Sequence, residues 1–136
     1  MKVPSEPLKV LVIDDDPTIL EIIKATLEDR NYVVTVRREP LGTTAQVGTL
    51  HPDFVILDIN MPALSGDHIA EILLKSGRIA PECIVFYSAS AETELVKLAR
   101  RHNAGGWIRK DGDTEAFAKK FDAIVQQSRT RRLGTK

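Results

Sequence analysis

Cysteine is almost missing from this 136-residue chain, which contains only Cys83. A single thiol cannot form an internal disulfide, and its place at the start of an apolar run predicts a buried structural residue. No apolar stretch approaches the roughly 20 residues that a membrane span needs. Residues 1–7 also lack the apolar segment of a secretory signal. We therefore expect a cytoplasmic protein that does not bind membranes.

The chain also lacks an excess of charge of either sign. Its 19 Lys and Arg residues balance its 19 Asp and Glu residues, which gives no electrostatic reason to expect direct binding of nucleic acid. We expect one domain at residues 8–128, preceded by an N-terminal extension at 1–7. Residues 129–136 form a basic tail or the start of a linker, which we interpret as a solvated end and not as a nucleic-acid contact.

Short apolar runs alternate with amphipathic segments along the chain. The apolar runs predict strands at 9–13, 32–36, 53–57, 83–87 and 106–109. The amphipathic segments predict helices at 17–29, 41–50, 67–76, 92–102 and 114–127. The second of these is a poor helix former because it contains Gly42, Gly48 and several threonines. Such alternation is typical of βαβ units, so we expect an α/β fold with a parallel sheet between two layers of helices.

Four of the apolar runs lead directly into polar side chains that can take part in chemistry, namely Asp14, Asp58, Ser88 and Lys110. Parallel strands bring their carboxyl ends to one edge of the sheet, where open α/β sheets hold ligands. Carboxylates, a hydroxyl and an ammonium at that edge suggest a site for a divalent cation and a phosphoryl group. Each residue alone is more typical of a cap, a turn or a solvated surface, so the prediction depends on their joint placement.

Three consecutive aspartates follow the first predicted strand. Asp16 precedes Pro17, a favoured first helical residue, and is therefore predicted to cap the helix. Asp14 and Asp15 remain as an acidic pair, and two carboxylates about 4 Å apart repel by about 4 kcal/mol at a protein-like dielectric constant. A bound divalent cation reverses the sign of that interaction. A site made of Asp15, Asp58 and a backbone carbonyl, with Asp14 holding a ligated water, matches the coordination habit of magnesium.

The segments Val-Leu-Val-Ile-Asp-Asp-Asp-Pro at 10–17 and Asp-Phe-Val-Ile-Leu-Asp-Ile-Asn-Met-Pro at 53–62 carry a resemblance to a known family. With Gly66, Ser88-Ala89 and Lys110, they resemble the receiver domain of two-component response regulators, including chemotaxis receivers, over about residues 8–128. The resemblance implies a flavodoxin-like, doubly wound sheet of five parallel strands in the order 2-1-3-4-5. It also implies a phosphoprotein of a phosphorelay, a signalling module and not an enzyme beyond self-phosphorylation and autodephosphorylation.

The resemblance assigns roles around a bound Mg2+ ion. Asp58 would be the phosphoacceptor and would also contact the metal. Asp15 would ligate the metal directly and Asp14 mainly through water, while Asn60 would give its backbone carbonyl. The phosphoryl group would come from a sensor histidine kinase or a histidine phosphotransfer protein, and the output would be a downstream protein or a fused domain.

The resemblance also assigns phosphoryl-binding and switch residues. Ser88 would hydrogen-bond a phosphoryl oxygen, the small side chain of Ala89 would leave room for the group, and Lys110 would pair first with Asp58 and then with the phosphoryl group. Gly66 would occupy a loop position that needs unusual backbone angles.

The sequence departs from the family pattern at two positions. Asp111 follows the lysine where the family usually has proline, often in a cis peptide, which leaves the shape of that loop open. Trp107 stands where a switching Tyr or Phe is common. Trp107 is interpreted either as a partly buried packing residue or as an aromatic switch that moves when Ser88 is drawn to the phosphoryl group.

Two other functions are weighed against this one. The stretch Asp14-Asp15-Asp16-Pro17-Thr18 also fits the start of haloacid-dehalogenase-like phosphatases, with Asp14 as nucleophile and Asp16 as general acid. That hypothesis needs a further acidic motif after the lysine strand and leaves the segment at 58–62 unused. A receiver fold that binds partners without being phosphorylated is the third possibility.

Overall fold

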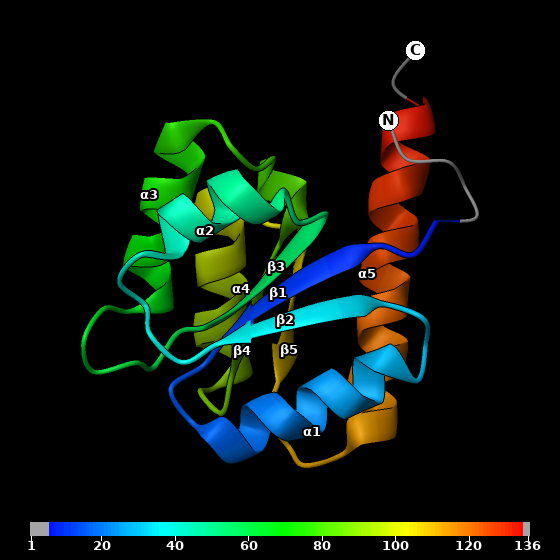
Figure 1. The fold of residues 1–136 in the computed structure, drawn as a ribbon, viewed down its shortest axis with the longest axis horizontal. Coiled ribbons are helices and arrows are strands. Elements are labelled where there is room, and N and C mark those ends of the chain that lie inside the picture. Colours follow the sequence, from blue (N-terminus) through cyan, green and yellow to red (C-terminus); the bar gives the residue numbers. More distant parts are fainter. Residues whose placement is uncertain (1–5, 135–136) are drawn as a thin grey trace.

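The computed structural model describes the backbone of residues 6–134 and the side chains of residues 6–130. Strands and helices alternate (Figure 1), as β1 (Lys9–Ile13), α1 (Pro17–Glu28), β2 (Val33–Arg37), α2 (Thr43–Leu50), β3 (Phe54–Asp58), α3 (Gly66–Ser76), β4 (Ile84–Ser88), α4 (Glu92–His102), β5 (Gly106–Arg109) and α5 (Thr114–Gly134). All strand pairs are parallel, in the order β2-β1-β3-β4-β5. The predicted doubly wound, flavodoxin-like sheet is confirmed.

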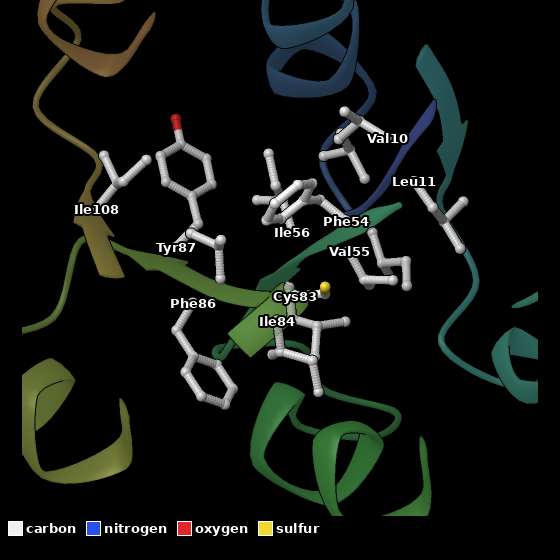
Figure 2. Close-up of a cluster of buried hydrophobic side chains, with 14 of the residues drawn as sticks. Val10, Leu11, Phe54, Val55, Ile56, Cys83, Ile84, Phe86, Tyr87 and Ile108 are labelled. Atoms are coloured by element: carbon white, nitrogen blue, oxygen red, sulfur yellow. The ribbon is translucent and has the colours of Figure 1, made fainter. Parts of the chain in front are cut away.

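The sheet lies between two layers of helices. Helices α1 and α5 pack on one side, and α2, α3 and α4 pack on the other (Figure 1). Strands β3 and β4 are buried along their whole length, which explains their continuous apolar runs. Figure 2 shows Phe86 and Tyr87, neighbours in β4, on opposite sides of the sheet. Accordingly, Phe86 contacts His102 of α4, whereas Tyr87 contacts Phe117 of α5.

The predicted strand boundaries are correct or one residue early. Strands β1 and β5 agree with the prediction, while β2, β3 and β4 each begin and end one residue later. As a result, Asp58 and Ser88 are the last residues of their strands and do not follow them. Cys83 lies in a short 3-10 turn (Pro81–Cys83) and is buried, as predicted.

Local sequence signals set the ends of two helices. The side chain of Asp16 accepts hydrogen bonds from the amides of Thr18, at 2.9 Å, and Ile19, which confirms the predicted cap of α1. Gly77 ends α3 in the left-handed conformation at φ 71°, where a residue without Cβ avoids strain.

All five helices form where they were predicted, and four differ in their bounds: α1 ends at Glu28, α2 begins at Thr43, α3 begins at Gly66 and α5 ends at Gly134. Helix α2 forms despite its poor composition because Val47 and Thr43 are buried, and the Thr43 hydroxyl donates to the Pro40 carbonyl at 2.6 Å. The prediction that the last helix ends at 127 was wrong, since α5 continues to Gly134. No proline interrupts residues 128–134, and arginine favours helix. Residues 1–5 of the predicted extension at 1–7 lie outside the described residues, as do the last two residues, 135–136.

Within the described part of the chain, no helix combines the length and the apolar character that crossing a membrane requires.

Candidate phosphoacceptor site

Four strands deliver polar side chains to one edge of the sheet. Asp14 follows β1, Asp58 and Ser88 end β3 and β4, and Lys110 follows β5. Asp14, Asp58 and Ser88 are buried residues, with at most 2% of their surface exposed. The amide of Lys110 donates to the Ser88 carbonyl at 2.8 Å, which continues the parallel ladder beyond β5. The sheet edge predicted from the four apolar runs is therefore present.

The Lys110 ammonium lies between two of the carboxylates. Its Nζ is 2.7 Å from Oδ2 of Asp14 and 3.4 Å from Oδ1 of Asp58. The ring of Tyr87 lies beneath it, with 5.1 Å between Nζ and the ring centroid. The ion pair with Asp58 was predicted. The shorter one with Asp14 and the contact with Tyr87 were not, because sequence spacing does not show which side chains surround a lysine.

The acidic cluster carries more negative charge than Lys110 can balance. Asp14, Asp15 and Asp58 each offer a carboxylate oxygen, and these oxygens lie within 4.8 Å of one another. Oδ1 of Asp14 accepts a hydrogen bond from the Asp16 amide at 2.9 Å. Oδ2 of Asp14 is buried and accepts no hydrogen bond from the described residues, so its partner is the Lys110 ammonium. Three oxygen donors around a residual negative charge fit a hard divalent cation such as Mg2+.

Burial and the neighbouring charges act in opposite directions on Asp58. Burial, and after it the negative charge of Asp14, raise the pKa of Asp58. The Asn60 amide, which donates to Oδ1 at 3.2 Å, and the Lys110 ammonium oppose that rise. The net effect is a raised pKa, so ionising Asp58 is less favourable in the folded protein than in the unfolded chain.

A second polar network lies beside the carboxylates. The side-chain amide of Asn60 donates to Oγ of Ser88 at 2.7 Å and to Oγ of Ser90 at 3.0 Å. The Ser88 hydroxyl donates to Ser90 Oγ at 3.0 Å and accepts from the Ser90 amide at 3.1 Å. The hydrogen bonds among these three side chains were not predicted from the sequence. The spacing of residues 58, 60, 88 and 90 was the one signal that could have indicated this network.

Gly66 is needed for a reason other than the predicted one. Its φ is not positive, and it is the first residue of α3. A Cβ built at this position would lie 2.4 Å from the backbone oxygen of Asp58. The expectation of unusual backbone angles was wrong, and the requirement for glycine comes from close approach to the end of β3.

The loop after Lys110 closes without a proline. The described residues contain no cis peptide bond, and Gly112 adopts φ 84°. The Asp113 amide donates to the Asp111 side chain at 3.0 Å, and the Asp113 side chain accepts from the Ala116 amide at 3.0 Å. Asp111 therefore forms an Asx turn that leads into α5.

The two remaining predicted residues are Ala89 and Trp107. Ala89 follows Ser88 and is exposed. Trp107 lies on β5 and is partly buried, with Nζ of Lys120 4.2 Å above its ring. Tyr87 was not predicted to be a site residue. Its burial, and after it the negative charge of Asp14, raise the pKa of its hydroxyl to about 12.

Comparison with known proteins gives the same assignment as the geometry. Residues 10–122 match the family described as response regulator receiver domain. The chain is 30% identical over 120 residues to the transcriptional regulatory protein MctR of Rhizobium johnstonii, covering 87% of this chain and 55% of MctR. It is 26% identical over 123 residues to the chemotaxis protein CheY of Pseudomonas aeruginosa, covering 88% of this chain and 98% of CheY.

A solved structure supports the fold. Chemotaxis protein CheY4 of Vibrio cholerae superposes with a TM-score of 0.78 at 23% identity, covering 87% of this chain and 98% of that one. The chain spans about half the length of MctR, so the activity of a longer regulator cannot be transferred to it directly. Because the family match covers most of its length, the chain belongs to the response regulator receiver domains, the phosphoacceptor modules of two-component signalling.

Proposed function

We propose that Asp58 accepts a phosphoryl group in this receiver domain. The observation that carries the proposal is the placement of its buried carboxylate, 3.4 Å from the Lys110 ammonium and within 4.8 Å of two further aspartates at the sheet edge. Phosphoryl transfer requires a nucleophile surrounded by positive charge and by hydrogen-bond donors. Asp14 shares burial, the Lys110 partner and a backbone donor. Asp58 is proposed as the acceptor because the resemblance to the family assigns that role to its segment at 58–62.

The transfer step follows from these positions. A carboxylate oxygen of Asp58 attacks the phosphorus of a phosphohistidine in line, the P–N bond breaks, and the imidazole leaves with its electron pair. Negative charge spreads over the three phosphoryl oxygens in the transition state. Lys110 moves from sharing its charge with Asp14 to pairing with those oxygens, and the Ser88 hydroxyl donates to one of them. The product is an aspartyl phosphate, which water later hydrolyses to phosphate and the free carboxylate.

The acidic cluster supports Mg2+ as the cofactor. Asp15, Asp58 and the Asn60 backbone carbonyl would hold the ion, with Asp14 acting through a ligated water. When bound, Mg2+ supplies positive charge toward the phosphoryl oxygens. The same charge would oppose the upward shift in the pKa of Asp58.

The phosphodonor is proposed to be a sensor histidine kinase or a histidine phosphotransfer protein in the cytoplasm. The output would be a downstream protein or a fused domain, which agrees with the greater length of MctR. Ser88 and Trp107 are the proposed switch residues. Trp107 lies on β5, whose Ile108 and Arg109 pair with the last two residues of β4, so a shift at Ser88 acts directly on its strand.

Incubation with acetyl phosphate and Mg2+, followed by intact and peptide mass spectrometry, tests the proposal. We expect one phosphoryl group per chain, located on Asp58 and absent from Asp58→Asn. Continued turnover of a phosphate ester with label on Asp14 would instead favour the phosphatase hypothesis, in which Asp16 is the general acid. Absence of label from all aspartates would favour a receiver fold that is not phosphorylated. In the folded protein the Asp16 side chain accepts a hydrogen bond from the Thr18 amide and caps α1, which disfavours its use as the general acid of the phosphatase hypothesis.

A further inference from the structure

Trp107 lies between a cation and an open groove at the free edge of the sheet. Strand β5 is the last in the sheet order, and Trp107 is the register partner of Phe86, so its side chain leaves the strand on the side of α4. The ammonium of Lys120 on α5 nevertheless lies 4.2 Å from the centroid of its ring. Because α5 packs on the opposite side of the sheet (Figure 1), Lys120 reaches the ring around this edge.

Close packing of α5 against β5 sets the place from which Lys120 reaches out. A Cβ built at Gly106 would lie 2.7 Å from Cδ1 of Ile124, so the absence of a side chain there lets α5 come near the strand. Ile124 follows Lys120 by one helical turn and lies on the same side of α5. Lys120 itself is exposed, so its ammonium is held over the ring by the attraction between a cation and an indole and not by burial.

The groove borders Trp107 on the side of α4. It has a volume of about 510 Å3 and is lined by Val96, Ala99, Arg100, Asn103, Ala104 and Trp107 itself. Two of these residues are alanines, whose small side chains leave space next to the ring. The indole can therefore leave Lys120 and turn into the groove without displacing a large core side chain.

We propose that Lys120 is a positioning residue that holds the Trp107 ring in its resting place, and so lowers the affinity of Asp58 for the phosphoryl group. This inference rests on the proposed function, in which Trp107 moves when Ser88 is drawn to that group. The attraction between Lys120 and the ring exists only in the resting arrangement, so binding of the phosphoryl group must overcome it. For a cation at an exposed position, the effect corresponds to a roughly twofold to fivefold change in affinity.

Three variants separate the cation over the ring from charge in general. Lys120→Met removes the ammonium and keeps a side chain of similar length, while Lys120→Arg keeps a cation that can lie over the ring. Lys119→Met is the matched control, because it removes the same charge from the neighbouring exposed position in α5. Each is also made together with Trp107→Leu, which removes the ring.

The main measurement is the affinity for beryllofluoride, a mimic of the phosphoryl group that cannot be hydrolysed, by calorimetry in saturating Mg2+. The fluorescence of Trp107, the one tryptophan of the chain, reports whether the ring lies beside Lys120. Urea unfolding establishes that each variant is folded, and acetyl phosphate labelling establishes whether Asp58 accepts phosphorus.

We expect Lys120→Met to bind beryllofluoride roughly two to five times more tightly than the parent, with Lys120→Arg and Lys119→Met close to the parent. The gain should disappear when Trp107 is leucine, since the two changes then share one interaction. The emission of Lys120→Met should differ from that of the parent without beryllofluoride and match it at saturation, when the ring has left Lys120.

Affinity of Lys120→Met equal to that of Lys119→Met, with Asp58 still labelled, overturns this inference alone. A gain that persists without the Trp107 ring, or that Lys120→Arg shares, does so too, because the cation over the ring would not be its cause. An emission difference that remains at saturation would show that the ring stays beside Lys120, with the same consequence. Failure of the parent to be labelled on Asp58 overturns the proposed function, and this inference with it.

Discussion

Replacing Asp58 with asparagine should stabilise the fold in the absence of divalent cations, although the change removes an ion pair. The Asp58 carboxylate lies 3.4 Å from the Lys110 ammonium and within 4.8 Å of an Asp14 oxygen. At a protein-like dielectric constant, the attraction to Lys110 is about 5 kcal/mol and the repulsion from Asp14 is about 3.5 kcal/mol. Lys110 retains its shorter ion pair with Asp14 in the variant. The exposed carboxylate of Asp15 also repels Asp58 in the parent, although water screens this interaction.

Because these charge interactions nearly cancel, the cost of burying the carboxylate decides the sign. That cost is several kcal/mol for a buried ion, and the hydrogen bond from the Asn60 amide offsets only about 2 kcal/mol of it. Asparagine has a similar shape, has no charge to desolvate and can still accept from that amide. We expect Asp58→Asn to raise the free energy of unfolding by about 2 kcal/mol near neutral pH.

The pH dependence follows from the raised pKa of Asp58. In the folded protein Asp58 takes up a proton at a higher pH than in the unfolded chain, where the ordinary value is 3.8. At a pH above the folded-state pKa of Asp58, its ionisation therefore lowers the free energy of unfolding by the full amount. This cost decreases as the pH falls from the folded-state pKa toward 3.8, where it disappears. The stability difference between Asp58→Asn and the parent should be largest near neutral pH and should vanish across that acidic window.

Urea unfolding followed by far-UV circular dichroism, in EDTA and in saturating Mg2+, measures these differences. Mg2+ should stabilise the parent more than Asp58→Asn, because the variant lacks one proposed ligand. Glu21→Gln removes the same charge from an exposed position in α1, and should stay within about 0.5 kcal/mol of the parent. If Asp58→Asn unfolded at a lower urea concentration than the parent in EDTA, or behaved like Glu21→Gln at every pH, the electrostatic reasoning would be refuted.

Three further substitutions test individual contacts. Tyr87→Leu removes the ring beneath the Lys110 ammonium and should slow labelling of Asp58 by acetyl phosphate roughly threefold to tenfold, whereas Tyr87→Phe keeps the ring and should label at nearly the parent rate; equal rates for both would assign Tyr87 to packing alone. Asp16→Ala removes the cap of α1 and should lower the free energy of unfolding by about 1 kcal/mol in urea, and no change would contradict the capping role. Gly66→Ala forces a methyl group against the Asp58 carbonyl oxygen, and should lower the free energy of unfolding by about 2 kcal/mol. It should also lower the rate at which acetyl phosphate labels Asp58. A variant as stable and as rapidly labelled as the parent would show that α3 can shift freely.

The sequence predicted the sheet and its polar edge because both depend on short-range patterns. A run of apolar residues that ends in one polar residue predicts a buried strand and its carboxyl end, and parallel connection then places Asp14, Asp58, Ser88 and Lys110 together. Alternation of strands and helices gave the fold class. The resemblance to receivers gave the strand order, which the polar residues by themselves do not specify.

The remainder depends on contacts between distant residues. The need for glycine at position 66 arises from the backbone of β3, eight residues earlier in the chain. The placement of the Tyr87 ring under Lys110 requires the side of the sheet on which each side chain emerges. The side-chain hydrogen bond of Asn60 requires the orientation of its amide toward Ser88. Helix α5 was predicted too short because its last turns lack the apolar periodicity on which the prediction relied.

The hydrogen bond from the Lys110 amide to the Ser88 carbonyl has a consequence for how receivers of this kind diversify. The bond belongs to the backbone ladder, so the backbones that carry Ser88 and Lys110 are held together by the fold and not by neighbouring side chains. Residues such as Asn60, Tyr87 and Ser90 can therefore be exchanged during evolution while the machinery for accepting phosphorus stays in register. Such exchanges would change rates and thresholds without separating the two backbones that carry Ser88 and Lys110.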